Sequence, residues 1–159
     1  MAMTTLIQKQ FLPVSIDTAW QFFATPANLN LITPKDMQFH ILSAVPEKMY
    51  EGLIINYRIK LFPLVWVNWT TEITHVKDGK YFVDEQRIGP YRIWHHEHHF
   101  KEVEGGVEMT DILHYDIGKW VFGWLAGVIF VHNKVQSIFE FRRTKLNTIF
   151  LPERQLKTA

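Results

Sequence analysis

The sequence has no cysteine among its 159 residues, which excludes a disulfide framework and thiolate metal sites. This absence fits a reducing compartment. An excess of charge of one sign is missing as well, because 17 Lys and Arg residues are balanced by 16 Asp and Glu residues. With a formal net charge of +1, the chain gives no reason to expect a nucleic acid or an acidic membrane surface as its partner.

Long hydrophobic runs are scarce. The longest, residues 120–131, is much shorter than the ~20 apolar residues that a membrane-spanning helix needs. The N-terminal stretch MAMTTLIQKQ lacks the apolar segment of a signal peptide. We therefore expect a cytoplasmic protein with no membrane span, in which residues 1–159 form a single domain with its own core.

Aromatic side chains, in contrast, are abundant. The chain contains 12 Phe, 6 Trp and 5 Tyr residues. Such side chains bury large apolar areas in a core, and they also line pockets for apolar ligands. A core rich in rings, or a pocket walled by them, is therefore expected.

Apolar residues recur at steps of three and four from residue 120 to residue 150, which predicts one long amphipathic helix. Phe139 lies on its apolar stripe, whereas Asn147 falls on the opposite, solvated face. His132 and Arg142 interrupt the stripe, so each is expected either to be paired or to lie at its edge. The rest of the fold should be organised around this helix.

The N-terminal part is predicted to begin with a strand over residues 5–14. Ser15 is a good N-cap for a short amphipathic helix that continues to Phe23. A second short helix should follow, because Thr25 offers a capping hydroxyl and Pro26 suits the first helical position. It should end before the next proline, since the residue preceding a proline avoids the helical region.

Between residues 37 and 117 the apolar period changes to two, the spacing of half-buried β-strands. Clusters of Gly, Pro, Asp and Glu interrupt the pattern, and Lys77-Asp78-Gly79 is a strong signal for a hairpin turn. Successive hairpins make an antiparallel sheet. The expected strands cover residues 38–45, 53–61, 65–73, 81–87, 92–103 and 107–117.

Together these elements predict an α+β fold, a curved antiparallel sheet of about six or seven strands wrapped round a long C-terminal helix, with two short helices after the first strand. A twisted sheet of this size curls. A single helix of about 10 Å diameter cannot fill the resulting concavity. We therefore expect a cavity between the sheet and the helix.

The densest chemistry lies in residues 81–100, YFVDEQRIGPYRIWHHEHHF. With a three-residue loop at Gly89-Pro90-Tyr91, the even-numbered residues of both flanking strands share one face. A two-residue loop would put Val83 and Glu85 on that face instead, because one step of register exchanges the faces. In the first arrangement the shared face carries Phe82, Asp84, Gln86, Trp94, His96, His98 and Phe100.

The next hairpin has a less ambiguous register. A turn at either Glu104-Gly105 or Gly105-Gly106 places Asp111, Leu113 and Tyr115 on the face of His96 and His98. The aromatic residues at the ends of this face indicate that it is the inner one. It would then be an apolar wall bearing a polar strip of Asp84, Gln86, His96, His98 and Asp111.

Three interpretations of the polar strip compete. The His-x-His spacing of His96 and His98, completed by Asp84 or Asp111, is typical of a metal site. A His and Asp pair could act as general acid and base, although no nucleophile motif or glycine-rich phosphate loop accompanies it. The third interpretation, buried polar groups that hydrogen-bond one another, is the one we favour, with no metal and no cofactor.

Three segments, FFATPANLNLITP, GPYRIWHHEHHF and TDILHY, resemble in order and spacing the ligand-binding branch of the START-related, pollen-allergen-like superfamily, often called SRPBCC. The resemblance extends over nearly the whole chain. It implies a helix-grip fold with a cavity for an apolar or amphipathic small molecule. Some members act as polyketide cyclases or hydrolases, but this sequence shows no catalytic signature that can be transferred residue by residue.

The leading functional hypothesis is binding of a hydrophobic or amphipathic small molecule, such as a lipid, an aromatic compound or a polyketide-like compound, between the sheet and the C-terminal helix. Any one of the aromatic residues could instead be packed core. The expected ligand-binding residues are Tyr57, Trp69, Phe82, Asp84, Gln86, Trp94, His96, His98, Asp111, Leu113 and Tyr115.

Two alternatives stay open. The chain could be an enzyme of cyclase, dehydratase or hydrolase type that uses His96 or His98 with Asp84 or Asp111. It could also be a partner-binding module, for which an exposed apolar patch is the expected sign. The aromatic residues within 120–124 could form such a patch, or the entrance to a cavity. The sequence does not indicate an oligomeric state.

Overall fold

The computed structural model describes residues 3–62, 64–118 and 124–150. Its chain runs through a strand, three short helices, a series of strands and a long helix, which confirms the expected α+β helix-grip architecture. The elements are β1 (Thr4–Leu12), α1 (Ile16–Ala24), the 3-10 helices η1 (Pro26–Ile32) and η2 (Lys35–Met37), β2 (His40–Ile41), β3 (Ile54–Phe62), β4 (Val65–Lys77), β5 (Tyr81–Ile88), β6 (Ile93–Val103), β7 (Gly106–Asp116) and α2 (Trp124–Phe150).

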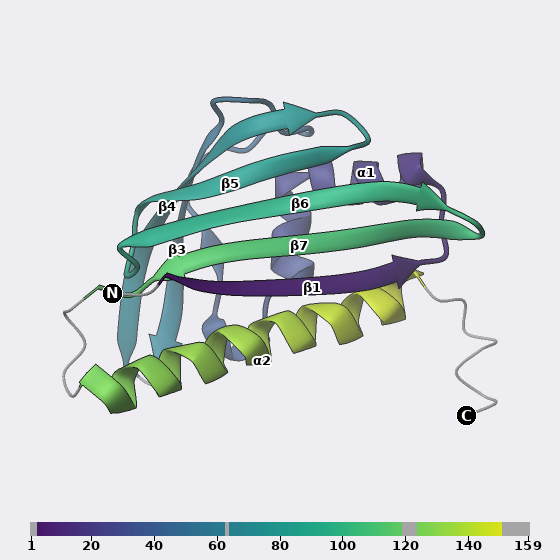
Figure 1. Cartoon of the computed structure of the whole chain (residues 1–159). Helices are drawn as coiled ribbons and strands as arrows, with labels where there is room; N and C mark the ends of the chain where they lie inside the picture. Colours follow the sequence, from purple (N-terminus) through teal and green to yellow (C-terminus); the bar gives the residue numbers. More distant parts are fainter. Residues whose placement is uncertain (1–2, 63, 119–123, 151–159) are drawn as a thin grey trace.

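The strands form one seven-stranded antiparallel sheet in the order β1-β7-β6-β5-β4-β3-β2. Strands β2 to β7 are neighbours in sequence order, with short turns joining β3 to β7 and a longer irregular segment joining β2 to β3, whereas β1 joins the sheet beside the last strand. Figure 1 shows the sheet curving from β7 at the front to β3 behind it, with α2 running alongside β1. The concave face is therefore enclosed by α2 and the short helices.

The long helix α2 carries the buried side chains expected of its apolar stripe, among them Val135 and Phe139. His132 is paired, because its Nδ1 lies 2.7 Å from the Tyr115 hydroxyl. The prediction that Asn147 lies on a purely solvated face is wrong. Its side chain is half-buried and accepts a 2.7 Å hydrogen bond from Gln10 of β1, which joins the helix to the edge of the sheet.

The start of the predicted helix, residues 120–123, lies outside the described residues, as does the side chain of Trp124. The proposed patch or entrance at these aromatic residues therefore stays a prediction. Within the described ranges, no helix combines the length and the apolar character needed to cross a membrane.

The short helices follow the sequence signals in part. Ser15 caps α1 as predicted, its Oγ accepting a 3.2 Å hydrogen bond from the Thr18 amide. Thr25 does not cap the next helix, because its hydroxyl donates back to the Gln21 carbonyl at 2.8 Å. That helix is a 3-10 helix rather than an α-helix, and its first turn closes with a three-residue step from the Asn28 amide to the Thr25 carbonyl.

The predicted strand over residues 38–45 is the main error in the sheet. Only His40 and Ile41 pair with β3. The ladder stops because the amides of Leu42 and Ser43 both point to the carbonyl of Asn56, at 2.8 and 3.4 Å, so the regular one-to-one alternation is lost. Residues 42–53 then run as irregular chain to β3.

Candidate functional site

A cavity of about 170 Å³ lies between the concave face of the sheet, the short helices and α2. Its wall is mainly apolar, with contributions from Phe23 of α1, Leu29 of η1, Ile55 and Ile59 of β3, and Ile138 of α2. A cavity of 150 Å³ lined by aliphatic and aromatic side chains can hold a benzene molecule. The space is therefore large enough for about one aromatic ring or a short aliphatic chain.

The structure brings most of the predicted ligand-binding residues to this cavity. Asp84 and His96 are opposite each other in the β5–β6 ladder, which is the register of the three-residue loop. In the β6–β7 ladder, the turn at Glu104-Gly105 places His98 opposite Asp111. The predicted residues that line the cavity are Tyr57, Trp69, Phe82, Asp84, Trp94, His96 and His98.

Gln86 lies on the expected face but serves the hairpin loop. Its Nε2 donates to the Tyr91 carbonyl at 2.6 Å, and its Oε1 accepts from the Tyr91 amide at 3.2 Å. The side chain folds over Gly89, where an added Cβ would lie 2.2 Å from the Gln86 Oε1 atom. Gln86 and Gly89 therefore hold the loop that positions Tyr91 at the cavity.

Leu113 and Tyr115 do not line the cavity. They are buried in a separate cluster with Val135 and Phe139 of α2, where sheet and helix are in direct contact. Asp111 also lies outside the lining, on the side of the two histidines that faces away from Asp84. The predicted inner face thus continues beyond the cavity into packed core.

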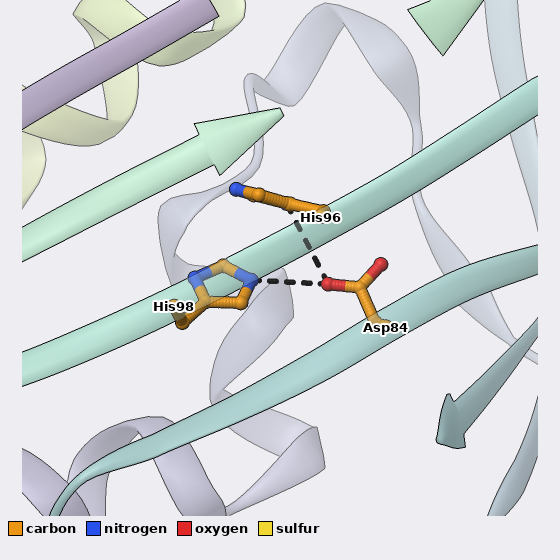
Figure 2. A group of neighbouring side chains, drawn as sticks. All are labelled: Asp84, His96 and His98. Atoms are coloured by element: carbon orange, nitrogen blue, oxygen red, sulfur yellow. Dashed lines mark hydrogen bonds and ion pairs between the residues drawn. The ribbon is translucent and has the colours of Figure 1, made fainter. Parts of the chain in front are cut away.

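Two carboxylates and two imidazoles form a compact cluster in the wall. His98 Nε2 lies 3.0 Å from Asp84 Oδ2, and His98 Nδ1 lies 2.6 Å from Asp111 Oδ1. His96 repeats the arrangement at longer range, with Nδ1 3.5 Å from Asp84 Oδ2 and Nε2 3.3 Å from Asp111 Oδ1. Figure 2 shows Asp84 on one strand directed towards both histidines of the next. The ring centroids of His96 and His98 lie 3.8 Å apart.

The contacts of Asp111 are close, but they lack the alignment of hydrogen bonds within the described residues. They act mainly through charge. Burial disfavours ionisation of both carboxyl groups. The hydrogen bond from His98 and nearby positive charge outweigh burial at Asp84, and the positive charge of His98 outweighs it at Asp111, so both carboxyl pKa values are lowered. Both carboxylates are therefore ionised at neutral pH.

The two histidines differ in protonation. Burial and the charge of His98 lower the pKa of His96 from 6.5 to about 4, although the carboxylates oppose this. For His98, burial is outweighed by the negative charges of Asp111 and Asp84 and by the hydrogen bond to Asp84, so its pKa is raised. The cluster thus places an imidazole whose pKa is lowered beside one whose pKa is raised, and both border the cavity.

Asp84, His96 and His98 are the described residues whose donor atoms could share a metal ion, since these atoms lie within 4.8 Å of one another. Histidine binds a metal ion through a ring nitrogen that carries no proton. In this cluster each imidazole nitrogen already lies beside a carboxylate oxygen, and the His98 pKa is raised. A cation would have to compete with a proton for His98, so we keep the prediction of no metal.

A second polar group lies on the β3–β4 side of the cavity. The Tyr57 hydroxyl is hydrogen-bonded to Thr71 Oγ1, which also accepts a 3.1 Å hydrogen bond from Trp69 Nε1. All of these residues are buried and line the cavity. Burial raises the pKa of Tyr57, so its hydroxyl is neutral.

Arg142 of α2 is a charged residue in the mainly apolar lining of the cavity. Its Nε and Nη1 atoms are buried and have no hydrogen-bond partner among the described residues. The guanidinium lies over the ring of Phe139, with Cζ 5.5 Å from the ring centroid. Arg142 therefore occupies the edge of the apolar stripe, as one of the two alternatives allowed, and this edge borders the cavity.

Sequence reasoning missed the part of the lining that comes from the short helices and from β3. The missed residues include Phe23, Leu29, Ile32, Ile55, Ile59 and Arg142. For Arg142 a signal was present, since a cation within an apolar stripe needs an explanation. The short helices gave no such signal, because their apolar residues are equally typical of core.

Comparisons with known proteins concern the fold. No protein-family model and no curated protein matches the sequence. Among solved structures, CV1439 from Chromobacterium violaceum is 10% identical and matches with a TM-score of 0.71 over 94% of this chain and 98% of that one. NE0264 from Nitrosomonas europaea is 12% identical, with a TM-score of 0.67 over 98% and 97% of the two chains.

Ara h 8.0201 is another solved structure with the same architecture. It is 13% identical to this chain and matches with a TM-score of 0.58 over 92% of this chain and 99% of its own. These similarities confirm the fold that the resemblance to the START-related, pollen-allergen-like superfamily implied. At such low identity they say nothing about a ligand or a reaction.

Proposed function

We propose that the protein binds a small, largely apolar molecule in the cavity between the sheet and α2. The observation that carries this proposal is the cavity itself, about 170 Å³ of space lined mainly by apolar side chains with a few polar groups. Ligand sites have this composition, in which apolar walls supply affinity and a few polar groups fix orientation. The fold-level resemblance to ligand-binding proteins supports the same role.

The size of the cavity favours a compact ligand. A flat aromatic compound could lie against Trp69 and Trp94, whose rings meet edge to face at 5.1 Å, and a short aliphatic chain would fit the same space. Both indoles border the cavity, so their fluorescence should report occupancy. A long lipid would require the wall to move.

Binding can be tested with an environment-sensitive apolar dye and with indole fluorescence. The native protein should bind about one equivalent of dye, which short fatty acids or flat aromatic compounds should displace. Ile55→Trp should abolish binding, because Ile55 lines the cavity and a larger ring would fill it. The matched control is Ile54→Trp, since Ile54 is 44% exposed on the opposite face of β3.

The outcome is decided by the pair of variants. Loss of dye binding in Ile55→Trp together with unchanged binding in Ile54→Trp supports the cavity as the site. Dye binding that persists in Ile55→Trp places the dye elsewhere and contradicts the proposal. Native mass spectrometry of freshly purified protein adds an independent readout, because a retained small molecule appears as a mass shift.

A second candidate function is an enzyme of cyclase, dehydratase or hydrolase type. The observation in its favour is that His96, whose pKa is lowered, and His98, whose pKa is raised, border the same cavity, an arrangement that can take up and release a proton. The test is the fate of the retained molecule. Conversion that is lost in His96→Gln supports an enzyme, whereas recovery of the unchanged molecule supports binding alone.

A further inference from the structure

The cavity wall contains a cation, Arg142, with two nitrogen atoms that form no hydrogen bond to the described residues. Arg142 reaches the cavity from α2, and its Nε and Nη1 atoms are buried without a hydrogen-bond partner among the described residues. Buried charges in native proteins are normally paired, because removing an ion from water costs several kcal/mol. Two buried guanidinium nitrogens without a hydrogen-bond partner among the described residues, at the wall of a cavity, therefore point to a partner that enters from outside the chain.

The carboxylate of Asp84 is not the hydrogen-bond partner of Arg142. Asp84 also borders the cavity, but its Oδ2 atom accepts the hydrogen bond of His98 and contacts His96. The charge of Arg142 is close enough to help lower the pKa of Asp84, yet no hydrogen bond joins the two side chains within the described residues. The Phe139 ring covers the guanidinium without accepting its N–H groups.

The hydroxyl groups on the β3–β4 side give a second, independent indication that the ligand carries a hydrogen-bond acceptor. Thr71 Oγ1 accepts from Trp69 Nε1 and is also hydrogen-bonded to the Tyr57 hydroxyl. The Tyr57–Thr71 contact can use only one of the two hydroxyl hydrogens. Whichever group donates, one hydroxyl hydrogen is left without an acceptor among the described residues. Both hydroxyl groups line the cavity, so an acceptor in the cavity could satisfy it.

The two unused donor sets border the same cavity, Arg142 from α2 and the hydroxyl pair from β3 and β4. The positive charge of Arg142 also acts on Tyr57, although it is the smallest of the influences on the Tyr57 pKa. A ligand with negatively charged oxygen atoms could therefore accept from the guanidinium and the hydroxyl together. A carboxylate fits best, because the planar guanidinium binds it through two parallel N–H···O bonds.

We propose that the ligand is a small aromatic or aliphatic carboxylic acid whose carboxylate binds Arg142, with the hydroxyl pair of Tyr57 and Thr71 as an additional donor. This inference rests on the proposed binding function and specifies its ligand class. The apolar part of the ligand lies against Ile55, Trp69 and the other apolar lining. The size of the cavity limits that part to about one aromatic ring or a short chain.

The test is calorimetric titration with a matched pair of compounds, phenylacetate and its neutral amide. Wild-type protein should bind the acid about 10-fold or more tightly than the amide, because hydrogen bonds to charged groups contribute more than neutral ones. Arg142→Met keeps an unbranched apolar chain about as long as the arginine stem and removes the charge, so the preference for the acid should disappear. The melting temperature of each variant verifies that it is folded.

Arg143→Met is the control, since it removes the same charge from an exposed neighbour on α2 and should retain the preference. Equal binding of acid and amide by the wild type overturns the carboxylate proposal and leaves the binding function standing. Binding of neither compound also overturns the carboxylate proposal, and the dye titration of the same protein then decides whether the binding function itself fails. A preference that survives in Arg142→Met, or that Arg143→Met abolishes equally, shows general electrostatics and overturns the role of Arg142.

Discussion

The concave side of the sheet has two parts that differ in how α2 meets them. At β7 the helix is in direct contact with the sheet, and Leu113, Tyr115, Val135 and Phe139 form a closed cluster. Towards β3 and β4 the sheet curves away, and the space between it and the helix is the cavity. We call these two parts the packed half and the cavity half.

The same helix serves both halves through neighbouring positions. Phe139 packs into the closed cluster, whereas Ile138 and Arg142, on an adjacent strip of the helix surface, border the cavity. His96 lies at the boundary between the packed half and the cavity half. Its ring centroid is 5.3 Å from that of Phe139, and the residue also lines the cavity. The difference shows that a straight helix can close only one side of a strongly curved sheet, and the open side remains available for a ligand.

The largest effect is expected from breaking the packed half. Phe139→Ala should lower the free energy of unfolding by about 3 to 5 kcal/mol, because it removes a core ring that is 4% exposed and leaves a void beside His96. Urea denaturation of the variant and the wild type measures this. Gln136→Ala, at an exposed position of the same helix, should change stability little. An unchanged midpoint in Phe139→Ala would remove that residue from the core.

Acidification is expected to lower the free energy of unfolding by a smaller amount, through His96 at the boundary between the two halves. The unfolded chain takes up a proton at His96 near pH 6.5, whereas the folded protein does so only near pH 4. Stability contributed by neutral His96 is therefore lost as pH falls through this window, by up to about 3 kcal/mol. The His98 contribution is already complete below pH 6.5, because its folded pKa is raised.

The pH effect can be measured as the free energy of unfolding at pH 7 and pH 4.5. His96→Gln should reduce the difference between the two values, because the titrating group is gone. His75→Gln, a change of an exposed histidine on β4, should leave the difference as in the wild type. If His96→Gln shows the full wild-type difference, the neutral state assigned to His96 is wrong.

The smallest effect is expected from chelation. Because the imidazole nitrogens of His96 and His98 lie beside carboxylate oxygens, metal analysis should find substoichiometric zinc, and a chelator should leave the melting temperature unchanged. One equivalent of zinc that survives dialysis would contradict this prediction, provided that His96→Ala combined with His98→Ala abolishes it. The cavity half would then be a metal site.

Most of the sheet could be predicted from the sequence, because its hairpins are local. The period of two, the glycine and the charged residues at the turns determine the strands from β3 to β7 within a few residues. Gly105 has φ of 79°, a conformation that glycine adopts without strain, so the turn before β7 and its register were predictable. This register brings Asp111 opposite His98, and the polar cluster follows from it.

The N-terminal region was harder, because its structure depends on contacts with distant parts of the chain. The Thr25 hydroxyl could cap either the helix that follows it or the one before it, and the structure uses the second. Residues 38–45 have the composition of a strand, but most of them do not pair with a neighbour. The helical pattern predicts a solvated Asn147, and only the fold shows that Gln10 of β1 donates a hydrogen bond to it.

The sequence by itself therefore determined the order of the elements and the shared face of His96, His98 and Asp111 on β6 and β7, since these depend on residues close together in the chain. The face of Asp84 and Gln86 stayed open between two loop registers, and the pairing of Asp84 with His96 in the structure decides it. Only the tertiary structure decided which inner residues border empty space and which are packed. Leu113 and Trp94 lie on the same face, yet one is closed by α2 and the other borders the cavity. The reason is physical: curvature and helix placement arise from the packing of the whole sheet, and no local pattern records them.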